Sequence, residues 1–245
     1  ARRPVAFFAY PNKPGVLTQE STKFIELASL SDDITSVINE LSDKVGISDN
    51  KPSTVSEFKI PDIPSGPINP TSLGMVLGAL IPENAIVVDE SVTTGREFFY
   101  QTAGSHPHTW LNNCGGSIGF GMPVAIGAAV ACPDKKVISL EGDGSAMYTV
   151  QSLWTMAREN LDIVVLIFAN QSYKILQGEL TNVGVDNPGK SALEMLSLKD
   201  PSLDWVSVSK GMGVDAVRVD NLEDLVKNFK HGLKDKGPFL IEVMI

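Results

Sequence analysis

Two residues that could hold a metal ion follow two apolar runs. Asp143 lies in the short run GDGS, just after Val137–Leu140, and Asn170 directly follows Ile163–Ala169. The second run, IVVLIFA, is apolar on both faces, as buried parallel strands are. The carboxyl ends of parallel strands meet at one edge of a sheet, where open α/β sheets bind ligands. We therefore expect Asp143 and Asn170, 27 residues apart, to provide oxygen ligands for one Mg²⁺ ion.

The residues around Asp143 indicate what the metal would hold. Gly142, Gly144 and Ser145 stand at the start of a helix-patterned stretch, 146–159, where free N–H groups and the helix dipole favour a phosphate. The Asp143 carboxylate would repel a pyrophosphate that has no metal ion. The run also lacks the third glycine of the dinucleotide-binding motif G-x-G-x-x-G. Both observations make a dinucleotide-binding dehydrogenase a much weaker hypothesis than a metal-dependent diphosphate site. A divalent cation removes the conflict by bridging the carboxylate and a diphosphate.

Two other segments give weaker signals. Val88–Thr94 closes an expected strand, and Thr93 is the best candidate there for donating to a phosphate, although helix capping by Thr93 or Ser91 is the structural alternative. The glycine-rich run at 113–121, NCGGSIGFG, would allow a backbone to approach a flat ring closely. A tight turn before a helix at Met122 explains that run equally well.

Composition narrows the class of protein. The 245 residues are 43% hydrophobic with a formal net charge of −9, which disfavours nucleic acid and anionic membranes as partners. Cys114 and Cys132 provide neither a disulfide framework nor a metal cluster, so we expect a cytoplasmic location. No apolar run has the length of a membrane span, and no signal peptide is visible. The start at Ala1, without Met, suggests a fragment of a longer chain.

The pattern of elements predicts an α/β fold with a doubly wound, mostly parallel sheet. The expected strands of this fold are Ile86–Asp89, Lys136–Leu140, Ile163–Ala169, Ala216–Val219 and Phe239–Met244. A helix beginning at Asn69-Pro70 and continuing through Ser72–Leu80 precedes them. Further helices are expected at Thr94–Tyr100, Met122–Ala131, Ala146–Glu159, Trp205–Lys210 and Leu222–Lys236.

The chain divides into three predicted parts. Residues 67–245 form the α/β domain, and the proline-rich residues 49–66 form an extended linker. Residues 1–48 contain two expected strands, Val5–Tyr10 and Lys23–Leu27, and a helix at Asp32–Val45. These elements are too few to bury a core of their own, so we expect them to be the end of another domain.

The run GDGS, with Asn170 and the glycine-rich run, resembles the cofactor motif of thiamine-diphosphate (ThDP) enzymes. The likeness covers 67–245 and points to the C-terminal, diphosphate-binding domain of the acetolactate synthase and benzoylformate decarboxylase branch. Residues 1–48 resemble the end of that family's middle domain. The family motif usually ends in Asn-Asn, whereas Ala169-Asn170 stands here. Asn170 matches the second Asn, which is the metal ligand, so the departure leaves the metal ligands intact.

The resemblance implies a role for each matching position. Asp143, Asn170 and the Ser172 carbonyl would hold Mg²⁺. Gly116 would offer its carbonyl to the aminopyrimidine ring, and Ile118 would be the wedge that bends the cofactor. The remaining cofactor-binding residues would be Thr93, Gly142, Gly144, Ser145, Tyr173, Lys174 and Ile175, with an ordinary exposed lysine as the equal alternative for Lys174.

The family also needs a catalytic Glu, which activates the aminopyrimidine ring and lies in a pyrimidine-binding domain. No stretch of this sequence matches that domain, so no catalytic residue is assigned here, and the domain would come from the full-length chain or a second subunit. The resemblance implies carboligation or decarboxylation of a small 2-oxo acid by a homodimer or homotetramer. The alternative is a ThDP- or diphosphate-binding module without catalytic activity of its own.

Overall fold

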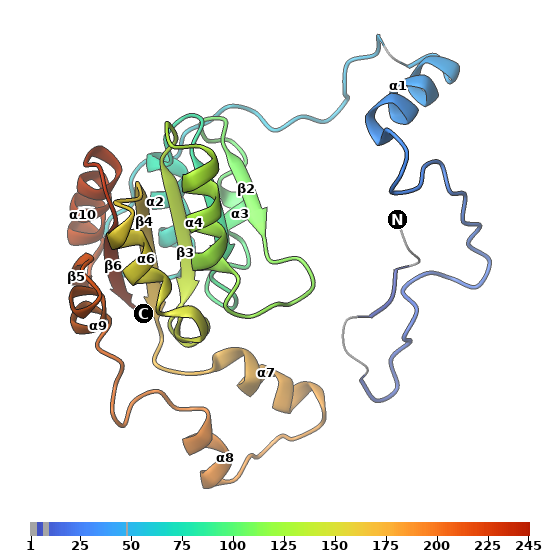
Figure 1. Cartoon of the computed structure of the whole chain (residues 1–245). Coiled ribbons are helices and arrows are strands. Elements are labelled where there is room, and N and C mark those ends of the chain that lie inside the picture. The colour runs from blue at the N-terminus through green and yellow to red at the C-terminus, as the bar shows by residue number, and fades with distance from the viewer. Residues whose placement is uncertain (1–3, 7–9, 48) are drawn as a thin grey trace. The chain divides into compact units, whose positions relative to one another are not determined.

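The computed structural model describes residues 4–6, 10–47 and 49–245. The chain forms two compact units: residues 1–55 with 181–185, and residues 56–180 with 186–245 (Figure 1). In the described residues, no helix is both long and apolar enough to cross a membrane. The assignment of 1–48 to a middle domain and of 49–66 to a linker stays a prediction.

The first unit contains the expected helix but not the expected second strand. Helix α1 spans Ile34–Lys44, and Asp33 caps it by accepting from the Ser36 N–H at 3.1 Å. Lys23–Leu27 is irregular, so that strand prediction was wrong. Apolar side chains alone do not make a strand, which needs a neighbouring backbone, and Ile25 is 81% exposed. Val5 forms an isolated antiparallel bridge with Val16, and residues 7–9 of the other predicted strand lie outside the described residues.

The second unit is built on a six-stranded parallel sheet, which confirms the predicted fold class. Its strands are β1 (Ile86–Glu90), β2 (Thr109–Asn112), β3 (Val137–Gly142), β4 (Ile163–Ala169), β5 (Asp215–Val219) and β6 (Phe239–Met244). Their order in the sheet is β2-β1-β3-β4-β6-β5, and every pairing is parallel. Only β2 was not predicted. It is a short edge strand whose four residues are all partly or fully exposed, so it carries little apolar signal.

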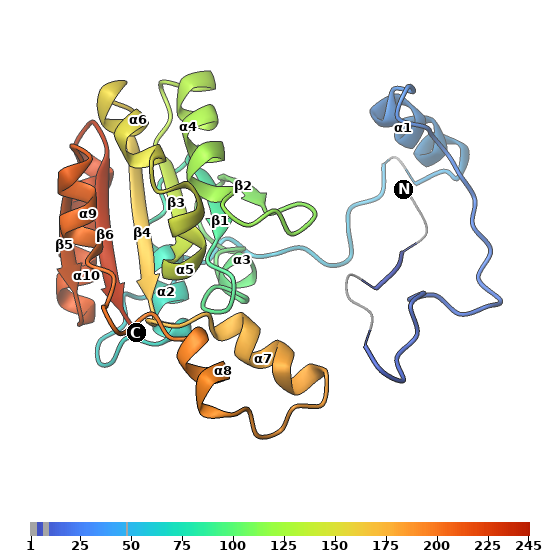
Figure 2. The same ribbon diagram turned by 60° about the horizontal axis from the view of Figure 1, so that its bottom comes forward.

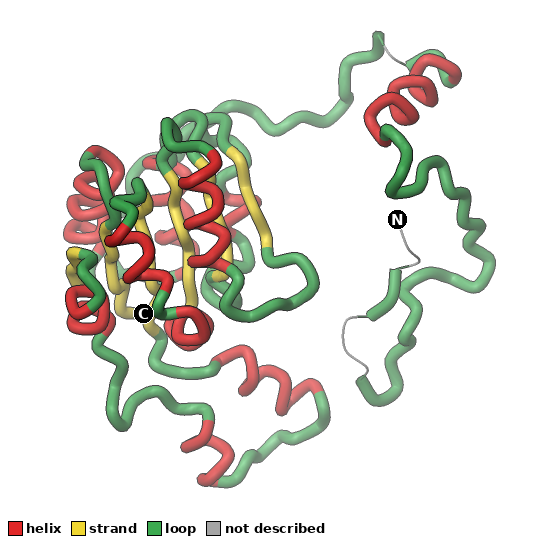
Figure 3. The backbone as a smooth tube through the Cα atoms, in the orientation of Figure 1, coloured by secondary structure: helices red, strands yellow, loops and turns green. Residues whose placement is uncertain are grey.

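Helices cover both faces of this sheet (Figures 2 and 3). The covering helices are α2 (Pro70–Leu80), α3 (Phe98–Gln101), α4 (Gly121–Ala131), α6 (Ser152–Arg158), α9 (Trp205–Gly211) and α10 (Leu222–Lys234). Strand β4 serves two cores: Leu166 and Phe168 pack with α2, α3 and α10, while Val165 and Ile167 pack with α4, α6 and α9. A strand buried on both faces must be apolar throughout, which explains the run IVVLIFA.

Two helical predictions required correction, and two further helices were not predicted. The single helix expected at Ala146–Glu159 is broken into α5 (Asp143–Ala146), the 3-10 turn η1 (Met147–Thr149) and α6. The Thr149 hydroxyl in this break donates to the Gly119 carbonyl at 3.0 Å, and such a tightened turn re-aims side chains. Turns precede the short α3, where a longer helix was expected. Two helices, α7 (Lys174–Asn182) and α8 (Lys190–Met195), were not predicted and have no buried residues to create an apolar period.

The order of the strands defines where a ligand would lie. From β1 the chain continues to β2 on one side, and then crosses to β3 on the other side of β1. The carboxyl ends of β1 and β3 therefore flank a topological switch point, where open parallel sheets form a crevice. Glu90 ends β1 and Gly142 ends β3, so the polar residues that follow both strands meet there.

Candidate functional site

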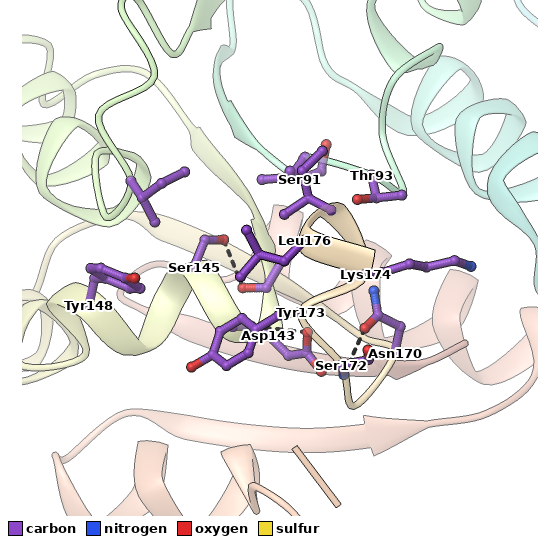
Figure 4. A pocket seen from close by; sticks show the side chains of 15 residues that line it. Ser91, Thr93, Asp143, Ser145, Tyr148, Asn170, Ser172, Tyr173, Lys174 and Leu176 are labelled. Carbon is purple, nitrogen blue, oxygen red and sulfur yellow. Dashed lines mark hydrogen bonds between the residues drawn. The ribbon is translucent and has the colours of Figure 1, made fainter. Parts of the chain in front are cut away.

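The structure brings Asp143 and the turn after β4 together, as the sequence predicts. The Asp143 side chain, 3% exposed, accepts from the Gln171 N–H at 2.6 Å and from the Gly144 N–H at 3.0 Å. Within the turn, the Asn170 side-chain oxygen accepts from the Ser172 N–H at 2.9 Å (Figure 4). Gln171 adopts a left-handed backbone conformation, with φ of 55°, which a non-glycine residue adopts at a cost. The turn is thus held in a defined shape beside the carboxylate.

Asp143 is an uncompensated buried carboxylate. Burial is the main reason why its pKa rises to about 6, and the backbone N–H groups of Gln171 and Gly144 oppose that rise. The nearby carboxylate of Glu242 adds to the pKa increase. No Lys or Arg side chain in the described ranges forms an ion pair with Asp143. A bound cation would supply the missing positive charge and favour the ionised form.

The donor set fits a hard divalent cation. Asp143 offers a carboxylate, Asn170 an amide oxygen and Ser172 a backbone carbonyl, all on the two segments that the Gln171 hydrogen bond joins. Mg²⁺ accepts such oxygen ligands and keeps several waters. Among the residues that the structure describes, no cluster of three or more His, Cys, Asp or Glu side chains could hold a metal. A metal site here must therefore combine one carboxylate with amide and carbonyl oxygens.

A pocket opens beside this donor set, and most of the predicted cofactor residues line it (Figure 4). The lining residues are Ser91, Val92, Thr93, Ile118, Gly142, Asp143, Gly144, Ser145, Tyr148, Asn170, Ser172, Tyr173, Lys174, Ile175 and Leu176. Gly144 allows a close approach there, because a Cβ at this residue would lie 2.7 Å from Cε1 of Tyr173. A side chain at this position would require the ring of Tyr173 to shift.

Two predicted phosphate contacts differ in detail from expectation. The Ser145 hydroxyl donates to the Gly142 carbonyl at 3.1 Å and approaches the Glu90 carbonyl at 3.4 Å, so it points at backbone. The segment Tyr173–Ile175, expected as a turn, contains the start of α7 at Lys174. Lys174 is exposed, and both Lys174 and Thr93, which follows β1, line the pocket (Figure 4).

The glycine-rich segment borders the pocket from one side. Gly115, Gly116 and Gly119 have φ of 84°, 68° and 87°, conformations that require glycine or strain another residue. Ile118 stands among them with 44% of its surface exposed, which is unusual for a core aliphatic side chain. Ile118 borders the pocket of Asp143 and also a neighbouring cavity, whereas Gly116 lines only that neighbouring cavity.

Two buried glutamates at the ends of β1 and β3 belong to this edge and were not predicted to support it. Glu90 and Glu141 are paired in the sheet register and are 2% and 0% exposed. The Ser139 hydroxyl donates to Glu141 Oε1 at 2.6 Å, and the Glu141 carboxyl group lies beside that of Glu90. Burial raises the pKa of Glu141 well above its usual range, and the Glu90 and Asp89 carboxylates add to the increase. The sequence signal that could have identified these two glutamates is a polar residue at the end of each apolar strand, in VVDE and SLEG.

Comparisons with known proteins agree with this geometry. A family model for thiamine pyrophosphate enzymes, describing their C-terminal TPP binding domain, matches residues 95–243. A Mycobacterium tuberculosis protein named provisionally as acetolactate synthase large subunit IlvX is 43% identical over 249 residues, which cover 100% of this chain and 47% of that protein. Benzoylformate decarboxylase of Pseudomonas aeruginosa is 35% identical over 179 residues, covering 73% of this chain and 32% of that protein.

A solved structure shares the fold. The thiamine diphosphate-dependent 4-hydroxybenzoylformate decarboxylase of Rhodococcus jostii RHA1 superposes with a TM-score of 0.72 at 32% identity. The superposition covers 85% of this chain and 38% of that chain. The chain thus spans about half the length, or less, of the relatives that it matches.

The fold and the site define an α/β domain that presents a ligand-binding edge at the switch point of a parallel sheet. The family match specifies which such domain it is. The chain belongs to the thiamine pyrophosphate enzymes and contains their C-terminal cofactor-binding domain, related to acetolactate synthase and to benzoylformate decarboxylase. The resemblance drawn from GDGS, Asn170 and the glycine-rich run is therefore confirmed.

Proposed function

We propose that this chain binds the diphosphate of ThDP through Mg²⁺ held by Asp143, Asn170 and the Ser172 carbonyl. The observation that carries the proposal is the buried Asp143 carboxylate, 3% exposed, which accepts from the turn after β4 and forms no ion pair with a Lys or Arg of the described residues. A carboxylate so placed costs free energy unless a cation compensates it. Mg²⁺ is the cation that oxygen donors and a diphosphate favour together.

The other pocket residues have distinct tasks in this proposal. Gly142, Gly144 and Ser145 let the backbone approach the phosphates, and the Thr93 hydroxyl, which lines the same pocket, donates to them. Tyr173, Lys174 and Ile175 form the rim, where the ammonium group of Lys174 lowers the remaining negative charge. The Gly116 carbonyl accepts from the aminopyrimidine amino group, and Ile118 supports the bend between the two rings.

The proposed reaction is carboligation or decarboxylation of a 2-oxo acid, of the kind that the names of the relatives describe. When bound, ThDP supplies an electron sink for the carbanion that decarboxylation leaves. The residues of this chain hold the cofactor, orient its rings and compensate its charge. With its two free cysteines, Cys114 and Cys132, the protein suits a reducing cytoplasm.

The activating carboxylate comes, in this proposal, from a pyrimidine-binding domain of the full-length chain or of a second subunit in a homodimer or homotetramer. Glu90 cannot be the activating carboxylate, since both its oxygens accept hydrogen bonds from N–H groups of the glycine-rich segment. Glu141 is 0% exposed and cannot meet the ring either. These contacts favour a second function for residues 1–245 taken alone, namely a ThDP- or diphosphate-binding module without catalytic activity.

Calorimetry with ThDP tests the binding proposal. We expect ThDP to bind in the presence of Mg²⁺ and to lose its affinity when EDTA removes the metal. Binding that is indifferent to EDTA would contradict the metal assignment.

Activity assays separate the two functions. With pyruvate or benzoylformate, ThDP and Mg²⁺, residues 1–245 should not turn over until a pyrimidine-binding domain is supplied. Mass spectrometry should first exclude longer contaminating chains. Steady turnover by residues 1–245 alone would show that the activating carboxylate lies within them.

A further inference from the structure

Glu90 occupies an unusual position for a carboxylate. It ends β1, is 2% exposed, and its two oxygens accept the N–H groups of Gly119 and Gly121, each at 2.6 Å. Hydrogen bonds to a charged acceptor are short and stronger than those between neutral groups. Glu90 thus fastens a segment about 30 residues further along the chain by its backbone.

Helix α4 depends on this carboxylate for its cap. The residue before the helix, Phe120, makes no side-chain cap, and the first turn contains no acidic residue. The first N–H groups of a helix have no partner within it, and a negative charge is favourable there. Glu90 accepts from Gly121, the first residue of α4, and so replaces the missing local cap.

The segment that Glu90 fastens carries the exposed Ile118. Gly119, next to Ile118, is held from both sides, because its N–H donates to Glu90 and its carbonyl accepts from Thr149 at 3.0 Å. Ile118 itself is 44% exposed, so packing of its own side chain does not determine its position. Its position depends on the backbone anchors on its C-terminal side.

We propose that Glu90 is a positioning residue for the cofactor rings. By clamping Gly119 and Gly121 it holds Ile118 in place, and through the same segment Gly116, against the rings of ThDP. This inference rests on the proposed function, in which these two residues face the cofactor. It adds a residue that touches neither the metal nor the diphosphate and acts only through the glycine-rich segment.

Glu90→Gln is the sharpest test. The amide has the same shape but only one acceptor oxygen, so one of the two N–H bonds is lost and two donors face each other. Asp162→Asn makes the same chemical change at a nearly buried carboxylate that pairs with Lys136 and Lys236 and lies before β4, at the opposite edge of the sheet. Thr149→Val removes the other anchor of Gly119 and is the milder second variant.

Amide hydrogen exchange without cofactor measures the clamp directly. In Glu90→Gln we expect whichever amide, Gly119 or Gly121, faces the new NH₂ group to exchange about 10-fold to 100-fold faster, since its hydrogen bond to a charged group is lost. Asp162→Asn should leave both amides unchanged. Unaltered exchange in Glu90→Gln would overturn the clamp.

The split between cofactor affinity and turnover measures the positioning role. In the complete enzyme, Glu90→Gln should reduce turnover per bound cofactor about 10²-fold, the size expected for a displacement near 1 Å, while ThDP affinity changes little. Normal turnover in Glu90→Gln would overturn the role of Glu90 alone. Failure of the wild-type protein to bind ThDP would instead overturn the proposed function, and the ring-positioning role with it.

Discussion

The two edges of the parallel sheet treat their carboxylates in opposite ways. At the amino edge, before β4, Asp162 is nearly buried and pairs with Lys136 and Lys236, the latter at 2.8 Å. Lys136 also donates to the carbonyls of Gly232 and Asp235 at 2.8 and 2.7 Å. Asp162, Lys136 and Lys236 are thus all paired within the protein.

At the carboxyl edge around β1 and β3, cationic side chains of the described residues do not pair with the buried carboxyl groups. Asp143, Glu90 and Glu141 are all buried, and in the described part of the chain no Lys or Arg forms an ion pair with any of them. Burial raises the pKa of each of these three carboxyl groups. Because Asp143 forms no ion pair with a Lys or Arg of the described residues, a ligand that brings positive charge would be favourable at this edge.

The largest effect should come from removing the carboxylate that the metal needs. Asp143→Ala should weaken Mg²⁺-dependent ThDP binding by at least about 100-fold, because few protein oxygens hold the ion. Calorimetry measures the change, and Asp162→Ala, a carboxylate removed at the other edge, is the matched control. Equal ThDP affinity in Asp143→Ala and in the wild type would contradict the proposal that the unpaired Asp143 carboxylate serves a metal ion.

Thermal unfolding gives a second measurement of the same change. Mg²⁺ and ThDP at about 100 times the dissociation constant should stabilise the wild type by about 2.7 kcal/mol. Asp143→Ala should show none of this ligand-dependent gain, whereas Asp162→Ala should keep it.

A second prediction separates ring geometry from anchoring. Ile118→Ala should lower turnover in the complete enzyme about 10-fold to 100-fold, because the cofactor rings lose their support. The affinity for ThDP should change little, since the diphosphate is held elsewhere in the pocket. Turnover is measured per bound cofactor. Loss of affinity with normal turnover would show that Ile118 only fills space.

The third prediction concerns the amino edge. Asp162→Ala should destabilise the protein by about 2 kcal/mol, since Lys136 loses its counter-charge in a site where its side chain is 9% exposed. The two carbonyl partners of Lys136 keep the loss below that of a fully buried pair. Denaturant unfolding measures the change, and Lys236→Ala, whose side chain is 74% exposed, should cost far less. Equal losses in the two variants would contradict this account.

The smallest predicted effect on stability concerns β5 and β6, where a cationic side chain, Arg218, pairs with carboxylates at the carboxyl edge. Arg218 donates to Glu242 at 2.8 Å and to Asp204 at 3.1 Å. The Ser207 hydroxyl and N–H lower the pKa of Asp204, and Arg218 lowers it further. A lowered folded-state pKa contributes stability above the unfolded value of about 3.9, and this stability is lost as the pH falls through the folded value.

Asp204→Ala should therefore cost about 1 kcal/mol at pH 7, mostly through loss of the α9 cap, and the difference should shrink as the pH falls below the unfolded value of about 3.9. Asp204→Asn keeps a capping oxygen, so it should reduce the stability by only about a few tenths of 1 kcal/mol. The lost ion pair contributes little because the side chain is half exposed and solvent screens the charges. Unfolding measured from pH 7 to pH 2 distinguishes the two variants. A difference that grows at low pH would contradict the assigned sign.

Local pattern alone was enough for the elements that carry their own signal. The run IVVLIFA predicted β4 because both of its faces are buried, and Asn69-Pro70 predicted the start of α2, where Asn69 accepts from the Ser72 N–H at 3.0 Å. The spacing of Asp143 and Asn170 predicted their meeting, because parallel neighbouring strands end at one edge. These inferences needed only periodicity, capping chemistry and the geometry of parallel sheets.

Tertiary contacts decided what local pattern could not contain. The break between α5 and α6 goes with Thr149 bonding to Gly119, which lies 30 residues earlier in the chain. The clamp of Glu90 on Gly119 and Gly121 joins residues 29 and 31 positions apart. From sequence alone, a carboxylate at the end of an apolar strand is expected to be exposed to solvent. Only the folded structure shows that unpaired N–H groups lie beside it. Residue types and spacing predicted the ligand edge, and the metal donors assigned to it stay a prediction, whereas the folded backbone decided that Glu90 holds the glycine-rich segment.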